Sequence, residues 1–320
     1  MSSSAQPPAV ENIQPYPRKF DGFIMPNIKN FTLTSGPGGP PCEVQHDVPA
    51  LVFSAGGLIR RRNFYHIFDD GLIPLFITVN TIFRPDQDFV IVASLATTWW
   101  SRKFPELMRM FTRHPIIIPK SFTPTHCFPS ATISLISHDF MTINQTLLST
   151  PKTFMDFRLL IHQAYTETSR RKIFASDPTD PQPILVWANR KGARGRMVAN
   201  LDQVVELMKK VGFDVKVVPI GLHWAADAFY GKVAKDLNLE YIEYRIGVDE
   251  SCLVDKYGNE GLLLKDPYAL LNKDKNGCPV ATDIRDIYLC QQDVKLDLTR
   301  FESCLMEVYH KARRFMKLND

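Results

Sequence analysis

His66 and Asp70 are the first residues whose types and spacing suggest chemistry. They lie in the segment NFYHIFDDG (63–71), where a spacing of four residues puts both on one face of a helix. A carboxylate in that position orients the imidazole, or either group takes a proton from an acceptor hydroxyl. A His-x-x-x-Asp pair is also a common structural hydrogen bond, so the pair alone leaves both interpretations open.

A second group of candidates is the basic segment NRKGARGR (189–196), with Asn200 beyond it. It follows the apolar run Ile184–Trp187, which we expect to be a buried strand. Open α/β sheets bind phosphorylated ligands at the carboxyl ends of their strands. The guanidinium groups of Arg190 and Arg194 suit a diphosphate because each donates two parallel hydrogen bonds. A solvated basic loop is the alternative.

Glycine and tryptophan mark the remaining candidates. The pair Gly56-Gly57 permits a tight turn and the close approach of a ligand after a strand. The segment 218–230 contains a Pro-x-Gly turn with Gly221 and then Trp224. It either packs a helix on the sheet or lines a nucleotide pocket. Trp99-Trp100 is either a sugar-stacking platform or a buried pair.

The first half of the chain must position these residues with short apolar runs bounded by turn residues. Such continuous runs favour buried parallel strands over alternating surface strands. They are Ala50–Ser54, Ile73–Val79, Phe89–Ala93, Pro115–Ile118 and Ala131–Ile136. Residues 1–45 are rich in Pro and Gly and are expected to be an extended lead-in without a core. Apolar spacing over 154–165 predicts an amphipathic helix.

The second half repeats the alternation of strands and helices after a Pro- and Asp-rich linker at 176–183. Strands are expected at Ile184–Trp187, Asp214–Val218 and Tyr241–Ile246. A helix over 204–211 should stop at Gly212, and a final helix over 298–315 should begin with a Thr299–Glu302 capping box. This pattern predicts an α/β protein with two Rossmann-like domains, 46–175 and 184–320.

Composition limits the class of protein. The net charge is only +4, and no run of five like charges occurs, so nothing indicates a nucleic-acid partner. The chain has no apolar stretch long enough to span a bilayer and no signal peptide at its start, which taken literally predicts a cytosolic protein. Asn30 and Asn144 begin glycosylation triplets, which matter only in a secretory compartment. Six scattered cysteines permit disulfides but make zinc binding unexpected.

Several segments together resemble glycosyltransferase family 61, in its plant branch of xylan arabinosyl- and xylosyltransferases. They are VPALVFSAGG (48–57), NFYHIFDDGLIPLFITV (63–79), THCFPSATISLISHD (125–139), MDFRLLIHQAY (155–165), NRKGARGRMVAN (189–200), VPIGLHWAADAFYGKVAKDLNLEYIEYRI (218–246) and DVKLDLTRFESCLMEVY (293–309). The resemblance implies a GT-B fold, with a UDP-sugar donor on the C-terminal domain and an acceptor on the N-terminal one. It also implies an inverting reaction without metal or other cofactor, in a Golgi protein whose membrane anchor lies upstream.

The resemblance also assigns roles to residues by position. Asp70 and His66 match the family's acid–base motif, and Arg190, Arg194 and Asn200 match its donor-phosphate segment. We expect Gly221 and Trp224 on the donor side as well. Gly56, Gly57 and Asn63 are expected to bind the acceptor, a polysaccharide or glycoprotein. The sugar transferred would be a pentose or N-acetylglucosamine.

The chain departs from the family pattern in three places. Arg62 precedes Asn63 where the family usually has Gly-Asn, and Ile67 follows His66 where it has an acidic residue. Between the strand near Val217 and the Val-Pro-x-Gly segment, relatives carry about one further βαβ unit, roughly 30 residues or more. That unit would contribute a helix N-terminus to the donor diphosphate. An inactive lumenal scaffold or truncated product of the same family is therefore the alternative to a transferase.

Overall fold

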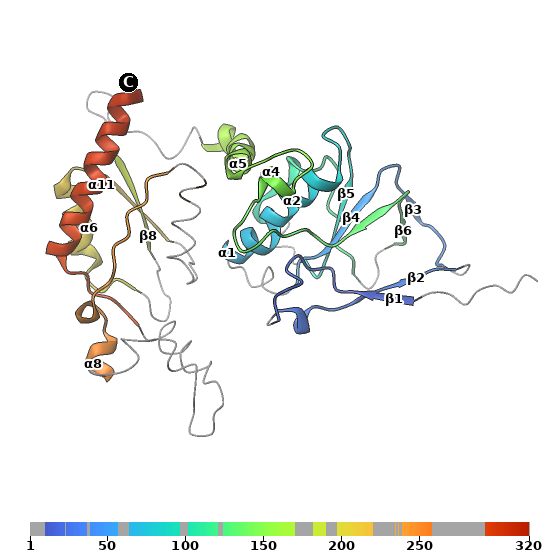
Figure 1. Ribbon diagram of the computed structural model, residues 1–320, viewed down its shortest axis with the longest axis horizontal. Helices are drawn as coiled ribbons and strands as arrows, with labels where there is room; N and C mark the ends of the chain where they lie inside the picture. The colour runs from blue at the N-terminus through green and yellow to red at the C-terminus, as the bar shows by residue number, and fades with distance from the viewer. Residues whose placement is uncertain are drawn as a thin grey trace, which may run out of the picture. The chain divides into compact units, whose positions relative to one another are not determined.

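A computed structural model gives the fold of this chain (Figure 1). It describes residues 10–22, 24–36, 39–56, 64–96, 102–120, 124–169, 182–189, 197–219, 234, 236, 239–257 and 292–319. Contacts divide the chain into two compact units. The described residues up to 169 lie in the first unit, and those of 182–219, 240–257 and 292–319 lie in the second. The GT-B arrangement of two facing domains stays a prediction.

A parallel sheet forms the centre of the first unit. Strand β4 (Ala50–Ser54) lies between β5 (Val90–Ser94) and β7 (Ala131–Ile133), and both neighbours run parallel to it. Ile117 makes a single parallel bridge to Val92 on the far side of β5. Four of the five apolar runs therefore lie in or beside this sheet, as their composition predicts, although the run at 115–118 contributes only that bridge.

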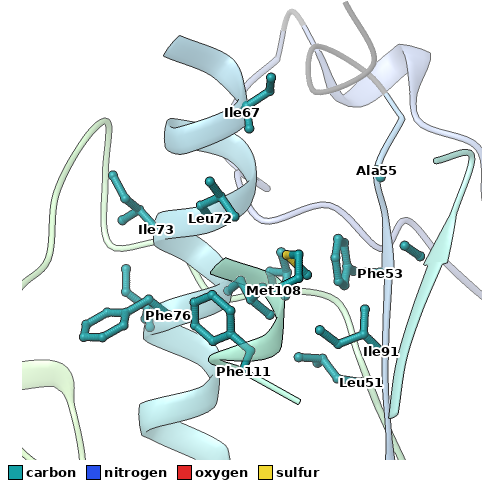
Figure 2. Close-up of a cluster of buried hydrophobic side chains, with 14 of the residues drawn as sticks. Leu51, Phe53, Ala55, Ile67, Leu72, Ile73, Phe76, Ile91, Met108 and Phe111 are labelled. Atoms are coloured by element: carbon teal, nitrogen blue, oxygen red, sulfur yellow. The ribbon is translucent and has the colours of Figure 1, made fainter. Parts of the chain in front are cut away.

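The prediction of a strand at Ile73–Val79 is wrong, because this run forms helix α2 (Ile73–Ile82). Residues 73–78 are all buried, so the helix has no polar face whose period would reveal it in the sequence. Pro74 fits the first turn of a helix, where its missing N–H is no loss. Figure 2 shows Ile73 and Phe76 of this helix in the same apolar core as Leu51 and Phe53 of β4.

The N-terminal segment differs from the expected extended lead-in. Strand β1 (Val10–Ile13) pairs antiparallel with β2 (Phe31–Thr34), and the short helix η1 (Met25–Asn27) lies between them. Tyr16, Ile24 and Ile28 are buried in the core of the first unit. Widely spaced large side chains are enough to anchor a Pro-rich segment, which composition alone does not reveal.

Smaller elements complete the first unit. They are β3 (Val44–Gln45) parallel to β6 (His126–Cys127), α1 (Phe64–Ile67), the π-helix η3 (Phe68–Leu72), α4 (Pro105–Arg109), η4 (Gln145–Leu147) and α5 (Phe154–Ser169). A disulfide joins Cys42 to Cys127 beside the β3–β6 pair. Helix α5 confirms the predicted amphipathic helix, and Thr153 and Asp156 cap its start.

The second unit contains a parallel strand pair, β8 (Ile184–Asn189) and β9 (Asp214–Pro219), joined through helix α6 (Leu201–Val211). Gly212 ends α6 with a φ of 115°, a conformation that favours glycine, as predicted. The short helices η5 (Val248–Glu250) and α8 (Leu253–Tyr257) precede the final helix α11 (Leu298–Asn319). Apolar residues of α6 and α11 share one buried core with β8 and β9.

Two further predictions for this unit are wrong. The run Tyr241–Ile246 forms no strand; instead the Tyr244 hydroxyl donates to the buried Glu250. Helix α11 is capped by Asp297, whose Oδ1 accepts the N–H groups of Thr299 and Arg300, so Thr299 is the second helical residue and not the cap. Within the described ranges, no helix combines the length and the apolar character that a membrane crossing requires.

Candidate functional site

The candidate site lies in the first unit, where helix α1 continues into the π-helix η3. His66 is on the last turn of α1, and Asp69 and Asp70 are on η3. Single π-turns inside helices occur often at functional sites. The core side chains Ile67 and Leu72 on either side are fully buried and hold this turn against the apolar cluster (Figure 2).

A buried arginine forms ion pairs with both aspartates. Arg18, in the N-terminal segment, is 1% exposed, and its Nε lies 2.7 Å from Oδ1 of Asp70. Its Nη1 donates to Oδ2 of Asp69 over 2.9 Å, and its Nη2 lies 3.1 Å from Oδ2 of Asp21. The guanidinium carbon is 4.3 Å from the centre of the Phe140 ring. Consecutive helical residues point in different directions, but the guanidinium reaches both because it carries donors on two edges.

His66 is the member of the site that reaches the surface. Its Nδ1 lies 2.8 Å from Oδ2 of Asp70, so the predicted His–Asp pair is formed. The His66 side chain is 20% exposed, whereas that of Asp70 is completely buried. Oδ2 of Asp70 is therefore hydrogen-bonded to His66, whereas Oδ1 lies in ion-pair contact with Arg18 without hydrogen-bond geometry. The arrangement allows the imidazole to exchange a proton with a bound molecule while Asp70 orients it from behind.

Asp69 has a different environment from Asp70. Its Oδ1 accepts the N–H of Met141 over 2.6 Å, and Met141 has a positive φ of 42°. Burial and the adjacent charge of Asp70 raise the pKa of Asp69 to about 6, against the opposing effects of Met141 and Arg18. Burial also raises the pKa of the neighbouring Tyr65 phenol, so this hydroxyl stays protonated and donates to Asp69.

The same groups include a possible set of metal ligands. One atom from each of His66, Asp69 and Asp70 lies within 4.8 Å of the others, and this is the one such group in the part of the chain that the structure describes. One imidazole and two carboxylates suit a divalent transition ion. The Arg18 guanidinium, however, already contacts both carboxylates and supplies the positive charge there.

Two further candidate site residues, Gly56 and Asn200, lie among the described residues. Gly56 is buried after β4, and a Cβ at this position would lie 2.9 Å from the Leu95 side chain, so only glycine fits without a shift. The amide of Asn200 donates to the Leu296 carbonyl and accepts from the Leu296 N–H, which ties the start of α6 to the segment before α11. A donor-binding role for Asn200 stays a prediction.

Most other candidates lie outside the described residues. They are Gly57, Asn63, Trp99, Trp100, Arg190, Arg194, Gly221 and Trp224. Strand β8 does end at Asn189, the first residue of the basic segment. Asn30 and Asn144 are both exposed, and the side chain of Asn144 accepts from Thr146 as the cap of η4. Their glycosylation stays a prediction.

Sequence reasoning missed Arg18 and the part played by Asp69. Arg18 lies 51 residues before Asp69 in a segment expected to be extended, and it carries no motif. The doublet Asp69-Asp70 inside an apolar stretch was the available signal, because buried carboxylates require a cationic partner somewhere in the fold. The identity of that partner was not deducible.

In this α/β unit, a buried carboxylate orients a partly exposed histidine, an arrangement suited to acid–base chemistry. Comparison with known proteins shows which class of enzyme the chain resembles. The chain is 29% identical over 369 residues to xylan glycosyltransferase MUCI21 of Arabidopsis thaliana, covering 95% of this chain and 71% of that protein. It is 28% identical over 348 residues to beta-1,2-xylosyltransferase XYXT1 of Oryza sativa subsp. japonica, covering 94% of this chain and 72% of that protein. It is 28% identical over 344 residues to alpha-1,3-arabinosyltransferase XAT3 of the same rice, covering 93% of this chain and 58% of that protein.

No protein-family model matches the chain. The chain is nevertheless homologous over about 95% of its length to plant xylan xylosyl- and arabinosyltransferases, which are members of glycosyltransferase family 61. Its homologues are glycosyltransferases. Each of the three alignments is longer than the 320-residue chain, so the relatives contain residues that have no counterpart here.

Proposed function

We propose that this protein is an inverting glycosyltransferase that moves a pentose from a UDP-sugar to xylan. The pentose and the xylan acceptor are proposed from the relatives, which are a xylan glycosyltransferase, a xylosyltransferase and an arabinosyltransferase. The homology supports the Golgi as its compartment. The observation that carries the proposal within this chain is the contact between His66 and the fully buried Asp70.

In this reaction His66 is the general base. Its Nδ1 is bonded to Asp70, so Nε2 is the atom that takes the proton from the acceptor hydroxyl. The acceptor oxygen forms a bond to the anomeric carbon of the donor sugar as the bond from that carbon to the diphosphate breaks. The diphosphate leaves with the electron pair, and Asp70 stabilises the imidazolium. We assign Arg190 and Arg194 to the departing diphosphate.

The geometry favours His66 over Asp70 as the base. Asp70 has no exposed surface and uses both oxygens within the protein, so a hydroxyl cannot reach it without breaking an ion pair. A carboxylate held in this way orients an imidazole and fixes its tautomer. Asp70 is therefore a positioning residue in the proposed reaction.

Substitution of His66 tests the proposal. We expect His66→Ala to lower kcat for pentose transfer by about 10²- to 10⁴-fold, because a general base contributes about that much. Asp70→Asn should also lower kcat, since an amide favours the wrong tautomer of the imidazole. Transfer is measured with a radiolabelled UDP-pentose and xylan oligosaccharides. Circular dichroism checks that each variant is folded.

The control is His162→Ala, an exposed histidine on α5 in the same unit, which should retain full transfer. If His66→Ala keeps most of the transfer while Asp70→Asn loses it, Asp70 is the base and the assignment above is reversed. If both variants transfer as well as the unmodified protein, the pair is structural.

A catalytically inactive binding protein of the same descent is the second candidate. The alignment lengths favour it, because residues present in the relatives are absent from this chain. Calorimetric titration with UDP separates the candidates. A transferase must bind UDP, whereas an absence of heat at millimolar UDP, together with an absence of transfer, selects the inactive protein.

A further inference from the structure

The proposed reaction gives no role to Arg18, although its side chain is among the most completely buried in the described part of the chain. Three of its nitrogens face three different carboxylates, those of Asp21, Asp69 and Asp70. The ring of Phe140 covers its plane. A charged group held on all sides in this way is fixed in position.

The cluster needs a cation for a physical reason. Asp69 and Asp70 are adjacent and at most 1% exposed, and burying two carboxylates without compensation is very costly. The three donors of a lysine ammonium diverge from a single atom, whereas the guanidinium spreads five N–H groups over a planar fork. Only the fork matches three carboxylates that approach from different edges.

We propose that Arg18 is the resident cation of this site, a positioning residue that compensates Asp69 and Asp70 and holds Asp70 against His66 where a divalent ion would otherwise bind. The proposal rests on the proposed function for its link to catalysis. The charge compensation itself does not depend on that function. Without the guanidinium, the carboxylates together with His66 offer three ligand atoms within 4.8 Å of one another.

The first experiment tests, without an activity assay, whether Arg18 occupies the place of a divalent ion. The variant Arg18→Met keeps much of the volume of the side chain but removes its charge. We expect it to bind about one Mn²⁺ per chain, since two carboxylates and an imidazole suit this ion, and the unmodified protein to bind none. Bound Mn²⁺ is counted by the loss of the free-ion signal in electron paramagnetic resonance.

Two controls locate the ion. The double variant Arg18→Met with Asp70→Asn should lose the gained Mn²⁺, because one ligand is missing. Arg113→Met removes an exposed arginine paired with Asp88 and should gain none. A folded Arg18→Met that binds no more Mn²⁺ than the unmodified protein overturns the proposal. An Arg18→Met that folds only with Mn²⁺ supports it, because the ion then replaces the guanidinium.

The second experiment uses Arg18→Lys, which keeps the charge but loses the fork. We expect kcat for transfer to fall by about 10²-fold, as a small displacement of Asp70 misplaces the base, with the KM values for donor and acceptor unchanged. Arg113→Lys should change neither constant. A kcat for Arg18→Lys equal to that of the unmodified protein overturns the positioning role. If the unmodified protein itself shows no transfer, the proposed function fails, and the Mn²⁺ titration still decides the role of Arg18.

Discussion

At the scale of single residues, the site depends on the charge balance among the buried groups Arg18, Asp69 and Asp70. Arg18 brings one positive charge to Asp69 and Asp70, so the second negative charge needs another partner. Burial and the charge of Asp70 raise the pKa of Asp69 from 3.8 to about 6, so Asp69 takes up a proton at a pH where a free aspartate stays ionised. His66 and Asp70 then remain as the pair for proton transfer.

The proton on Asp69 makes a prediction for the pH dependence of stability. Between about pH 4 and 6 the folded state keeps a proton that the unfolded chain has released, so stability falls as pH rises through this window and levels off above it. The two-unit difference corresponds to about 3 kcal/mol at most. We expect this contribution to be absent from Asp69→Asn, as measured by urea unfolding at pH 4 to 7.

The exposed Asp139→Asn should keep the pH profile of the unmodified protein. If Asp69→Asn and the unmodified protein lose stability in parallel over this window, then Asp69 stays ionised throughout and its ion pair with Arg18 dominates over burial.

At the scale of elements, the sequence predicts helices with one polar and one apolar face, and strands that are short and apolar throughout. Helices α5 and α6 each have a polar and an apolar face, and the strands β4 and β5 are continuous apolar runs, so their patterns identify them. Residues 73–78 of helix α2 are all buried, so this apolar run looks like a strand in the sequence. The pair His66–Asp70 is local and was predictable from spacing, whereas Arg18 reaches the site through a long-range contact that no local pattern encodes.

Helix α2 is fixed to the sheet side of the unit by a buried threonine. The Thr78 hydroxyl donates to the Pro74 carbonyl over 2.7 Å and accepts the N–H of Ile136 over 2.7 Å. We expect Thr78→Val to keep the shape but leave the Ile136 N–H without its acceptor, at a cost of about 1–3 kcal/mol. Urea unfolding monitored by circular dichroism measures this difference.

Thr81 on the same helix provides the matched control. Its hydroxyl donates to the Ile77 carbonyl over 2.7 Å, within the helix. Thr81→Val should therefore cost less than about 0.5 kcal/mol, because a back-bonded hydroxyl contributes little to a helix. Equal losses from the two variants would show that Thr78 does not join α2 to the chain after β7.

At the scale of the whole molecule, the described part of the second unit contains one strand–helix–strand unit, formed by β8, α6 and β9. Its described residues form a sheet of only two strands, β8 and β9. Strand β9 pairs with β8 from Asp214 to Pro219 without interruption. The two sequence blocks on either side of the Val217–Val218 junction are therefore fused in a single strand. The point at which relatives are expected to carry a further βαβ unit therefore lies inside a continuous strand of this chain.

Restoring that unit gives the last prediction. We expect a chimaera with the corresponding residues of the Arabidopsis relative inserted between Val217 and Val218 to bind UDP at least about tenfold more tightly, because the insertion would add a helix N-terminus to the diphosphate site. A glycine–serine insert of equal length is the control and should give no gain, and calorimetry measures both. Equal UDP affinity in the chimaera, the control and the unmodified chain would mean that the absent residues do not form the donor site. The basic segment after β8 would then have to bind the diphosphate without them.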